Sequence, residues 1–396
     1  MMNYRTLIIA GMGSIGSSLV QLGEHVLDDF DRVVGIDLHP ERSAGAPGPV
    51  SFIQGDIRDP VFLTETLHRV PSPAIFLNIC NGADNVKIRR IVAMFDAAYI
   101  DSCCSALDTG GRPENLFSNL MPYTHTRVAG RRPQWLCWGI NPGMVEIIAR
   151  KLMMDFQEPD AFFDVEIYEH DRLEAKLNDS AVGVGWSPED LIDEVMVSPS
   201  FQIMDGRPTE GTGKGAEKVL AVWQGRPVPS RLVGHEDIWN LGRIPEVKNA
   251  RFIYALHPGA MKILEGDLDG ARRRLKVPGR HVPVAGLEQV AVQVISKKSR
   301  RQKALLWAVD HAAVWEEHGV NAVQYQTGKC LLLAIKLLQR TRYGKLPVNC
   351  CASSLPITGP DWQHIEIAME ELGIHWENAD ALGLHSAPPA LAPSTP

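Results

Sequence analysis

The sequence lacks the features that would tie it to a membrane, a nucleic acid or an oxidising compartment. Its seven cysteines are odd in number and form no C-x-x-C pair, so neither a disulfide framework nor a zinc site is indicated. No apolar stretch is long enough to span a bilayer, and the first strand begins too early to leave room for a signal peptide. The net charge of −7 argues against nucleic acid or an anionic membrane as the main partner. We therefore expect a cytoplasmic protein that binds neither, and whose charge suits a cationic substrate.

The composition is typical of a globular protein, and the chain is long. Hydrophobic residues make up 45% of the 396 residues and charged residues 22%. A chain of this length exceeds the usual size of one hydrophobic core, so two domains are predicted.

The most informative segment covers residues 4–37. An apolar run ends at Ala10, the turn Gly-Met-Gly-Ser-Ile-Gly follows, and then come a helical pattern and a second strand that ends at Asp37. This order is typical of a Rossmann dinucleotide-binding fold. Gly11 allows the tight turn, Gly13 lets the backbone approach the pyrophosphate, and Gly16 lets helix and strand pack closely. The helix that begins here, with Ser14 and Ile15, presents free N–H groups to the phosphates.

The acid at the end of the second strand indicates which dinucleotide is bound. Asp37 would accept hydrogen bonds from the adenosine ribose and repel a 2′-phosphate, which favours NAD over NADP. His39 and Arg42 follow closely and are able to partner a phosphate, so NADP stays open.

Three further residues are predicted to line this domain's ligand crevice. Asp56 ends a third strand, where it either contacts the adenine end of the cofactor or caps a helix that begins near Pro60. Asn81 follows a fourth strand and is expected to face the nicotinamide half. Asn141 precedes a helix that runs to about residue 156, and is either its N-cap or an amide that binds substrate or nicotinamide. About six parallel strands are expected in this sheet.

From about residue 160 the pattern changes to strands separated by loops. The predicted fold is α/β, with an N-terminal Rossmann dinucleotide-binding domain and a second α+β substrate and dimerisation domain on an antiparallel or mixed sheet. The predicted boundaries are 1–145 for the NAD-binding domain, 146–320 for the substrate-binding domain, 321–385 for C-terminal helices that brace the first domain, and 386–396 for a disordered tail.

The second domain contains many acidic, aromatic and histidine side chains. Each of them alone has an ordinary structural explanation, but together they suggest a cation site in which carboxylates hold an ammonium, a tryptophan stacks on it and a histidine moves protons. Arg172, Arg207 and Arg243 leave the alternative that arginines bind a carboxylate group of the substrate. No close His/Cys spacing recurs, so no metal is predicted. The side chains are Glu169, His170, Asp171, Trp186, Glu189, Glu194, His235, Glu236, Asp237, Trp239 and His257.

From the first strand to about residue 340 the sequence resembles the bacterial homospermidine synthases, within the saccharopine dehydrogenase-like superfamily. The resemblance rests on Gly11–Gly16, Gly139–Val145, Glu169-His170-Asp171, Trp186-Ser187 with Glu194, the His235 loop, His257-Pro258, and Asn321 to Gly328.

The resemblance implies an NAD-dependent enzyme, typically a homodimer, that condenses diamines without net redox change. Putrescine would be oxidised to an imine, a second diamine would replace ammonia, and reduction by the same bound NADH would yield homospermidine. His235 would transfer protons, Glu169 and Glu194 would bind ammonium, Trp186 would stack on it, and Asn141 would orient the reacting amine or the nicotinamide. His257 and an acid beside His235, Asp237 or Glu236, would complete the substrate site.

Two other functions compete with this one. A saccharopine- or opine-type dehydrogenase would join an amine to a keto acid or aldehyde with net NAD(P)H consumption, and would need an Arg or Lys clamp. An NAD(H)-binding regulatory or scaffold protein would have kept the fold without turnover.

Overall fold

The structure, a computed structural model, describes residues 4–39, 50–104, 120, 123–178, 180–211, 213, 215–223, 225–279, 281–345, 349–379 and 385–386. The chain divides into two compact units. The first comprises Met1–Glu146 and Gln324–His375, and the second comprises Ile147–Val323 and Trp376–Pro396.

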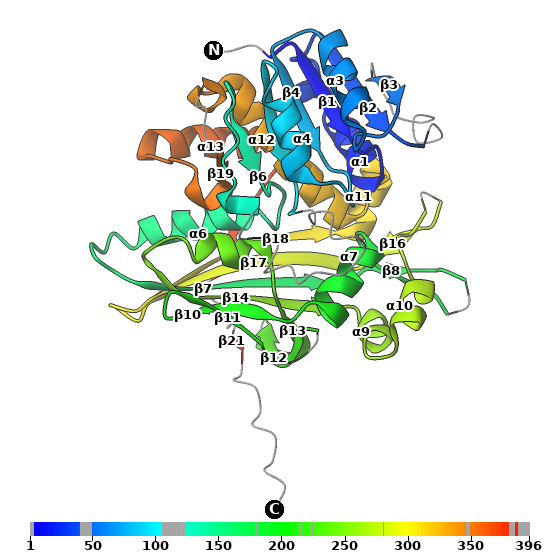
Figure 1. Ribbon diagram of the computed structural model, residues 1–396. Helices are drawn as coiled ribbons and strands as arrows, with labels where there is room; N and C mark the ends of the chain where they lie inside the picture. The colour runs from blue at the N-terminus through cyan, green and yellow to red at the C-terminus, as the bar shows by residue number, and fades with distance from the viewer. Residues whose placement is uncertain are drawn as a thin grey trace, which may run out of the picture. The chain divides into compact units, whose positions relative to one another are not determined.

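The first unit is built on a parallel sheet of seven strands among the described residues, in the order β19-β6-β5-β4-β1-β2-β3. The part β3-β2-β1-β4-β5-β6 is the strand order of a Rossmann fold, and Figure 1 shows β4, β1, β2 and β3 side by side. The apolar side chains of the central strands are buried on both faces, as expected for a parallel sheet covered by helices. The strands are β1 (Thr6–Ala10), β2 (Arg32–Asp37), β3 (Val50–Gln54), β4 (Ala74–Asn78), β5 (Ala97–Asp101), β6 (Gln134–Leu136) and β19 (Asn349–Cys351).

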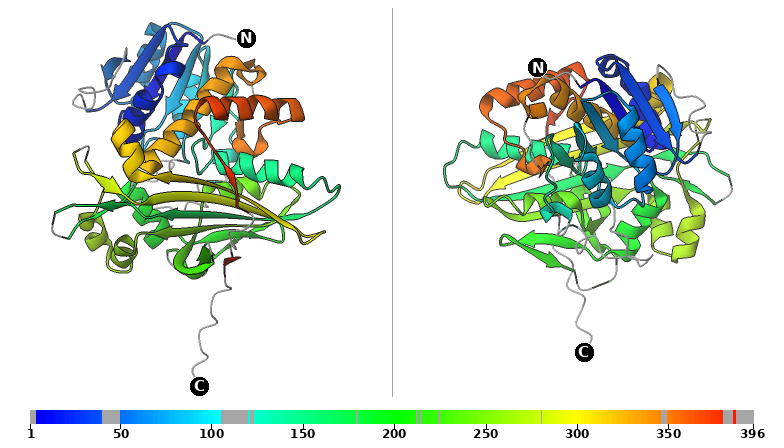
Figure 2. Two further views of the ribbon diagram at one scale, coloured as in Figure 1. Left: turned by 180° about the vertical axis from the view of Figure 1, so that it is seen from behind. Right: turned by 45° about the horizontal axis from the view of Figure 1, so that its top comes forward.

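The helices of this unit lie against the sheet and against one another. The long helix α12 runs beside α1 (Figure 2), where a Cβ on Gly23 would lie 2.7 Å from Leu332 Cδ2. The close approach of Leu332 on α12 to the end of α1 therefore requires glycine at position 23. The helical elements are α1 (Ser14–Leu22), α2 (Glu24–Leu27), α3 (Pro60–Arg69), α4 (Asn85–Val92), α6 (Met144–Asp155), α12 (Ala322–Arg340), η3 (Arg342–Lys345), η4 (Ala352–Ser354) and α13 (Gly359–Glu371), and the unit boundaries fall within α6 and α12.

The second unit contains a mixed sheet of ten strands among the described residues. Its main path is β20-β18-β17-β7-β14-β13-β12-β21; β10 pairs with β14 and β11, and β7 and β14 are parallel. Figure 1 shows β18, β17, β7 and β14 as neighbours. The strands are β7 (Phe163–Asp171), β10 (Phe201–Met204), β11 (Arg207–Glu210), β12 (Glu217–Trp223), β13 (Arg226–Val233), β14 (Val247–Leu256), β17 (Leu287–Ser296), β18 (Gln302–Asp310), β20 (Glu377–Asn378) and β21 (His385–Ser386).

Short elements surround this sheet. Two small strand pairs are β8 (Glu174–Ala175) with β16 (Val284–Ala285), and β9 (Val182–Gly183) with β15 (Leu275–Lys276). The helices are α7 (Pro188–Ile192), a π-helical turn η2 (Asp193–Val197), α8 (Glu236–Leu241), α9 (Pro258–Leu264), α10 (Leu268–Arg274) and α11 (His311–His318).

The two faces of the ten-stranded sheet differ in chemistry because successive side chains of a strand point to opposite faces. On one face Tyr168, Ile253 and Ala291 belong to a buried apolar cluster. The opposite face therefore carries Glu169 and Asp171 from β7. The other members of the apolar cluster are Ala221, Trp223, Leu232, Ala304, Leu306 and Ala379.

The predicted fold class is confirmed, with corrections of detail. The parallel sheet has a seventh strand, because β19 from the C-terminal segment pairs with β6. All seven cysteines are free thiols. No helix in the described part of the chain is both long and apolar enough to cross a membrane. Of the predicted disordered tail, only Ser386 lies within the described residues, at the end of β21.

Candidate active site

The glycine turn of the first unit has the geometry that a dinucleotide site requires. Gly11 follows β1 with φ +101, in the left-handed region that glycine adopts at no steric cost. A Cβ on Gly16 would lie 2.1 Å from Gly11 O, so the helix can start this close to the strand only with glycine there. Gly13 caps α1 without a side chain, and this leaves the first N–H groups of the helix, from Ser14 and Ile15 on, facing outward from the turn. These residues form a cradle suited to a pyrophosphate.

Asp37 lies at the carboxyl end of β2, beside this turn. It is buried, and its carboxylate accepts the backbone N–H of Met12 at 2.8 Å and that of His39 at 3.0 Å. These two bonds hold the carboxylate at the strand end, where a ribose would lie in a Rossmann site. Arg42, the other residue considered as a phosphate partner, lies outside the described residues.

The three other residues predicted for this crevice have different surroundings. Asp56 does not cap α3, because Asp59 accepts the N–H of Val61 in that role, and Asp56 pairs with Arg58 at 2.8 Å instead. The Arg58 guanidinium lowers the pKa of Asp56. Asn81 is exposed in the loop after β4.

Asn141 lies in a turn three residues before α6 begins at Met144, so the N-cap explanation is wrong. The turn closes through a bridge between Gly139 and Gly143, and a Cβ on Gly143 would lie 2.7 Å from Gly139 N. The side chain of Asn141 is half-buried, and the residue lies on a tight turn bounded by Gly139 and Gly143.

A buried polar network at the ends of β4 and β5 was missed by the sequence analysis. Asn78 donates to Asn85 Oδ1 at 2.8 Å and to Tyr99 Oη at 3.1 Å. Asp101 accepts from Tyr123 Oη and, at 2.8 Å, from Cys137 N, and burial raises its pKa to about 6. The available signal was an acid that ends an apolar strand, the same pattern as at Asp37.

In the second unit, the acidic residues gather on the face of the sheet opposite the apolar cluster. Tyr254 of β14 is the register partner of Glu169 on β7, and Glu288 of β17 is that of Asp171. His170 points to the other face, where its ring packs against Trp223. The sequence triplet Glu169-His170-Asp171 therefore contributes two residues to the site and one to the core.

His235 joins the same face of the sheet through Phe252, on which its ring stacks with a centroid distance of 4.3 Å. It immediately precedes α8, which begins with Glu236 and Asp237. His235 Nδ1 lies 2.9 Å from Asp237 Oδ2 and 3.8 Å from Glu236 Oε2. The Asp237 carboxylate lies beside Nδ1 without the geometry of a hydrogen bond, and His235 Nε2 lies 4.0 Å from Glu194 Oε1. Of the two candidate acids, Asp237 is the closer partner.

The electrostatics of this site are those of crowded carboxylates, of which Glu169 and Glu236 are buried and Glu194 is half-buried. Burial raises the pKa of Glu194 well above its usual value, and Glu236, Glu169, Asp190 and Asp193 raise it further. Burial lowers the pKa of His235, an effect that Glu236 opposes. The imidazole is therefore held neutral and able to accept a proton.

Trp186 is anchored to this cluster by a hydrogen bond from its Nε1 to Tyr254 Oη, at 3.1 Å. The indole is half-buried in the loop between β9 and α7. Because Tyr254 Oη accepts this bond, its own proton is available to a carboxylate. Burial raises the pKa of Tyr254 well above its usual value, and Glu169, Asp171 and Glu288 raise it further. Tyr254 and Glu288 are members of the cluster that sequence reasoning missed, since each reads as part of an ordinary apolar strand.

Other predicted residues lie elsewhere in the second unit. His257 is the N-cap of α9, where its Nδ1 accepts the N–H of Gly259 at 3.1 Å. Arg172, Arg207 and Arg243 are exposed, and the charged neighbours that most raise the pKa of Glu194 and Glu288 are carboxylates. The predicted carboxylate clamp is therefore not assembled by these arginines.

Metal-ligand side chains come together twice within the described residues, with ligand atoms within 4.8 Å of one another. The groups are Asp171, Glu288 and His311, and Glu194, His235 and Glu236. In the first group His311 Nδ1 accepts the N–H of Ala322 at 3.0 Å, so its proton lies on Nε2, which then has no lone pair for a metal. The absence of a metal stays a prediction.

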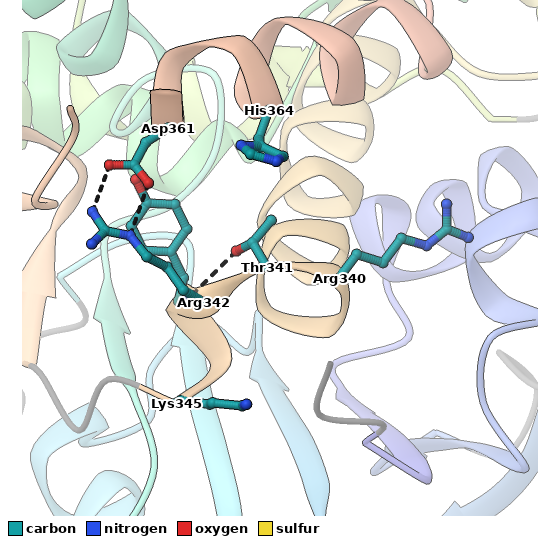
Figure 3. A pocket seen from close by; sticks show the side chains of 7 residues that line it. Arg340, Thr341, Arg342, Lys345, Asp361 and His364 are labelled. Atoms are coloured by element: carbon teal, nitrogen blue, oxygen red, sulfur yellow. Dashed lines mark hydrogen bonds and ion pairs between the residues drawn. The ribbon is translucent and has the colours of Figure 1, made fainter. Parts of the chain in front are cut away.

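A surface cavity of about 330 Å³ in the first unit lies apart from all the predicted site residues of that unit. Figure 3 shows Arg342 paired with Asp361 at its wall, and Arg340 pairs with Asp29 and Glu371. Its positive charges are thus largely compensated. The lining residues are Arg340, Thr341, Arg342, Tyr343, Lys345, Asp361 and His364.

No family model matches the sequence, and no curated protein matches it. Solved structures do match. The homospermidine synthase of Legionella pneumophila in complex with NAD is 12% identical, with a TM-score of 0.73 over 97% of this chain and 91% of that chain. The apo saccharopine dehydrogenase (L-Glu forming) of Saccharomyces cerevisiae is 10% identical, with a TM-score of 0.58 over 97% of this chain and 100% of that chain. At these identities the likeness establishes the fold.

Proposed function

We propose that the chain is an NAD-dependent enzyme that condenses diamines in the manner of a homospermidine synthase. The observation that carries this proposal is the acid cluster around Glu169, Glu194 and His235, in which burial and four neighbouring carboxylates raise the pKa of Glu194. Burying like charges is costly unless a cation neutralises them. A diammonium supplies two such charges and the hydrogen-bond donors that carboxylates accept. The likeness of the fold to a homospermidine synthase supports the same choice.

We propose NAD as the cofactor, held through its pyrophosphate by Gly11, Gly13, Ser14, Ile15 and Gly16. Asp37 would bind the ribose, and Asp56 and Asn81 would contact the adenine and nicotinamide ends. The left-handed Gly11 and the close approach of Gly16 to Gly11 O support the cradle. When bound, NAD would accept a hydride from the carbon that bears the reacting amine and return it after the amines have exchanged.

Different residues of the second unit would act on the two ends of a diamine. The reacting nitrogen must be neutral before its carbon can lose a hydride, so His235 Nε2 would take its proton, with Asp237 holding the opposite ring nitrogen. The same imidazole would return a proton to the departing ammonia. Glu169 and Glu194 would bind the ammonium that stays charged, with Trp186 stacked on it. Asn141 is proposed to orient the amine or the nicotinamide.

A saccharopine- or opine-type dehydrogenase is the alternative. It would need a cation to hold the substrate carboxylate, whereas Arg172, Arg207 and Arg243 are exposed. This is why we prefer a substrate without a carboxylate. Homodimerisation and a cytoplasmic location stay predictions.

Incubating the protein with putrescine and NAD tests the proposed function directly. We expect mass spectrometry to detect homospermidine and ammonia, with no lasting rise in NADH absorbance because the hydride is returned. No product from putrescine, but NADH consumption when a keto acid or aldehyde is supplied with an amine, would replace the proposal by the opine-type alternative. The absence of product and of NADH consumption, in protein that binds NAD, would favour a regulatory or scaffold role.

Replacing Trp186 by glutamate tests the cation site. We expect KM for the diamine to rise more than about tenfold, because a cation–π contact of up to about 2 kcal/mol is lost and a carboxylate crowds the site. NAD binding should be unchanged. Trp186→Phe is the matched control, since it keeps an aromatic face and loses only the bond to Tyr254. Unchanged turnover of Trp186→Glu would contradict the cation-site model.

A further inference from the structure

Three fully buried titratable side chains lie beside the acid cluster without a part in the proton transfer described above. Asp171 and Glu288 are 1% exposed and His311 is 0% exposed. Asp171 ends β7, and Glu288 faces it directly across the antiparallel pair of β7 and β17. His311 is the first residue of α11.

The hydrogen bonds of this group determine where its protons lie. Because Nδ1 of His311 accepts from Ala322 N, the neutral imidazole has its proton on Nε2 and donates it to Asp171 Oδ1 at 3.1 Å. Leu173 N donates to the same oxygen at 2.9 Å. Asp171 Oδ1 thus receives two donors, as suits an ionised carboxylate.

The second oxygen of each acid lacks a donor. Asp171 Oδ2 and Glu288 Oε2 are buried, and neither has a hydrogen-bond partner among the described residues if both acids are ionised. Two ionised carboxylates placed together in a dry interior would repel strongly, whereas a single proton between them satisfies both oxygens. Burial raises the pKa of Glu288 well above its usual value, and Asp171 and Glu169 raise it further. Glu288 is therefore the member that holds the proton.

The acid pair also supports the segment that carries Trp186. A Cβ on Gly185 would lie 2.9 Å from Asp171 Oδ2, so the backbone of this segment lies directly against the Asp171 oxygen that lacks a donor. Asn321 Nδ2 also donates a hydrogen bond to Gly185 O, at 2.9 Å, and this bond fixes the same segment. A change in the separation of Asp171 and Glu288 would be transmitted to Gly185 and so to the indole that follows it.

We propose that Asp171 and Glu288 share one proton and act as positioning residues that hold the Gly185–Trp186 segment in the arrangement that binds the amine. The role in amine binding rests on the proposed function, whereas the shared proton does not. The groups that face Glu288 are Asp171 and Glu169 from β7, Tyr254 from β14 and His311 from α11. When Glu288 loses its proton at high pH, the two carboxylates repel and the Trp186 segment loses its support.

The pair predicts how stability and amine binding depend on pH. The pKa of Glu288 is raised in the folded protein above its ordinary value of 4.5, so the folded state binds more protons than the unfolded state between these two values. The free energy of unfolding therefore falls as pH rises through this interval, and Glu288→Gln, which cannot ionise, removes that contribution. In the wild type KM for the diamine should rise roughly tenfold through the folded pKa of Glu288, as a cation–π contact is lost, while kcat changes little.

The experiment compares the wild type with Glu288→Gln and Asp171→Asn, and uses Glu174→Gln as the control because Glu174 is exposed on β8. Infrared spectra across the alkaline range follow the C=O absorption of protonated carboxyl groups. We expect Glu288→Gln, but not the control, to lose one such group and the alkaline rise in KM. Asp171→Asn should keep the group but lose its absorption at a lower pH than the wild type, because Asp171 no longer raises the pKa of Glu288.

Three results would overturn the inference. A spectrum of Glu288→Gln that matches the wild type, or an alkaline titration of the carboxyl absorption that Asp171→Asn leaves unchanged, would show that no proton is shared. An unchanged alkaline rise in KM of Glu288→Gln would show that the pair does not position Trp186. Because the infrared measurement needs no substrate, it shows whether Asp171 and Glu288 share a proton even if putrescine is not turned over. In that case the pH dependence of Trp fluorescence in the wild type and Glu288→Gln decides whether the pair holds the Trp186 segment.

Discussion

Replacing His235 by asparagine is expected to lower the turnover of a diamine by about 10² to 10⁴-fold, with NAD affinity unchanged. His235 Nδ1 lies 2.9 Å from Asp237 Oδ2, and the asparagine amide can place a donor near the same position. Asp237 would thus keep a partner, which matters because an uncompensated buried carboxylate costs about 3–5 kcal/mol. The variant loses only the base at Nε2. Turnover is measured by product formation and NAD affinity by titration.

The control for this variant is His25→Asn, since His25 is exposed on α2. It should behave as the wild type in both assays. Near-normal turnover of His235→Asn, in protein that remains folded, would remove His235 from the proton-transfer role and direct attention to Glu194, whose pKa burial raises well above its usual value.

Gly16→Ala is expected to weaken NAD binding by about fivefold to 150-fold, corresponding to an overpacking cost of about 1–3 kcal/mol. The added Cβ would lie 2.1 Å from Gly11 O, which is a backbone atom and cannot move unless the turn opens. An opened turn no longer presents the start of α1 to a pyrophosphate at the required distance. Titration of the protein with NAD, together with thermal unfolding, measures both consequences.

Gly359→Ala is the matched control, because Gly359 is also in the first turn of a helix but a Cβ there meets no atom within 4 Å. It should leave NAD affinity unaltered. If Gly16→Ala binds NAD as tightly as the wild type, the glycine turn is not the pyrophosphate site.

The parts of the fold that could be predicted from sequence are those encoded locally. Gly11 and Gly16 are explained by backbone geometry within one turn, and the predicted helix and strand that follow correspond to α1 and β2. The seventh strand of this sheet was not predictable in the same way. β19 comes from Asn349–Cys351 and pairs with β6, which is far away in the sequence.

The candidate site shows the same limit. His235, Glu236 and Asp237 are adjacent in the chain, so a histidine with an acid at hand was visible. The sequence could not show which of the two acids lies closer to His235, since this depends on the path of the backbone at the start of α8. Glu288 and Tyr254 were missed because only pairing of β7 with β17 and β14 brings them to Glu169 and Asp171.

Local rules also left two roles open for each of two polar residues near helix starts, and in both cases the capping role is wrong. Asp56 and Asn141 were both considered as N-caps, but α3 is capped by Asp59 and α6 begins three residues after Asn141. An Asp or Asn near a helix start satisfies the rule at several positions, and only the path of the backbone selects one.

The alternation along β7 makes the site intolerant of changes in the length of that strand. Glu169 and Asp171 face Tyr254 and Glu288, while Glu166, Tyr168 and His170 alternate with them on the other face. Deleting one residue within β7 would exchange the two sets and bring a phenol and an imidazole to the positions of the carboxylates. Loops around the sheet can change length over evolutionary time and alter which ligand the site admits, but β7 itself is free to diverge only by substitution.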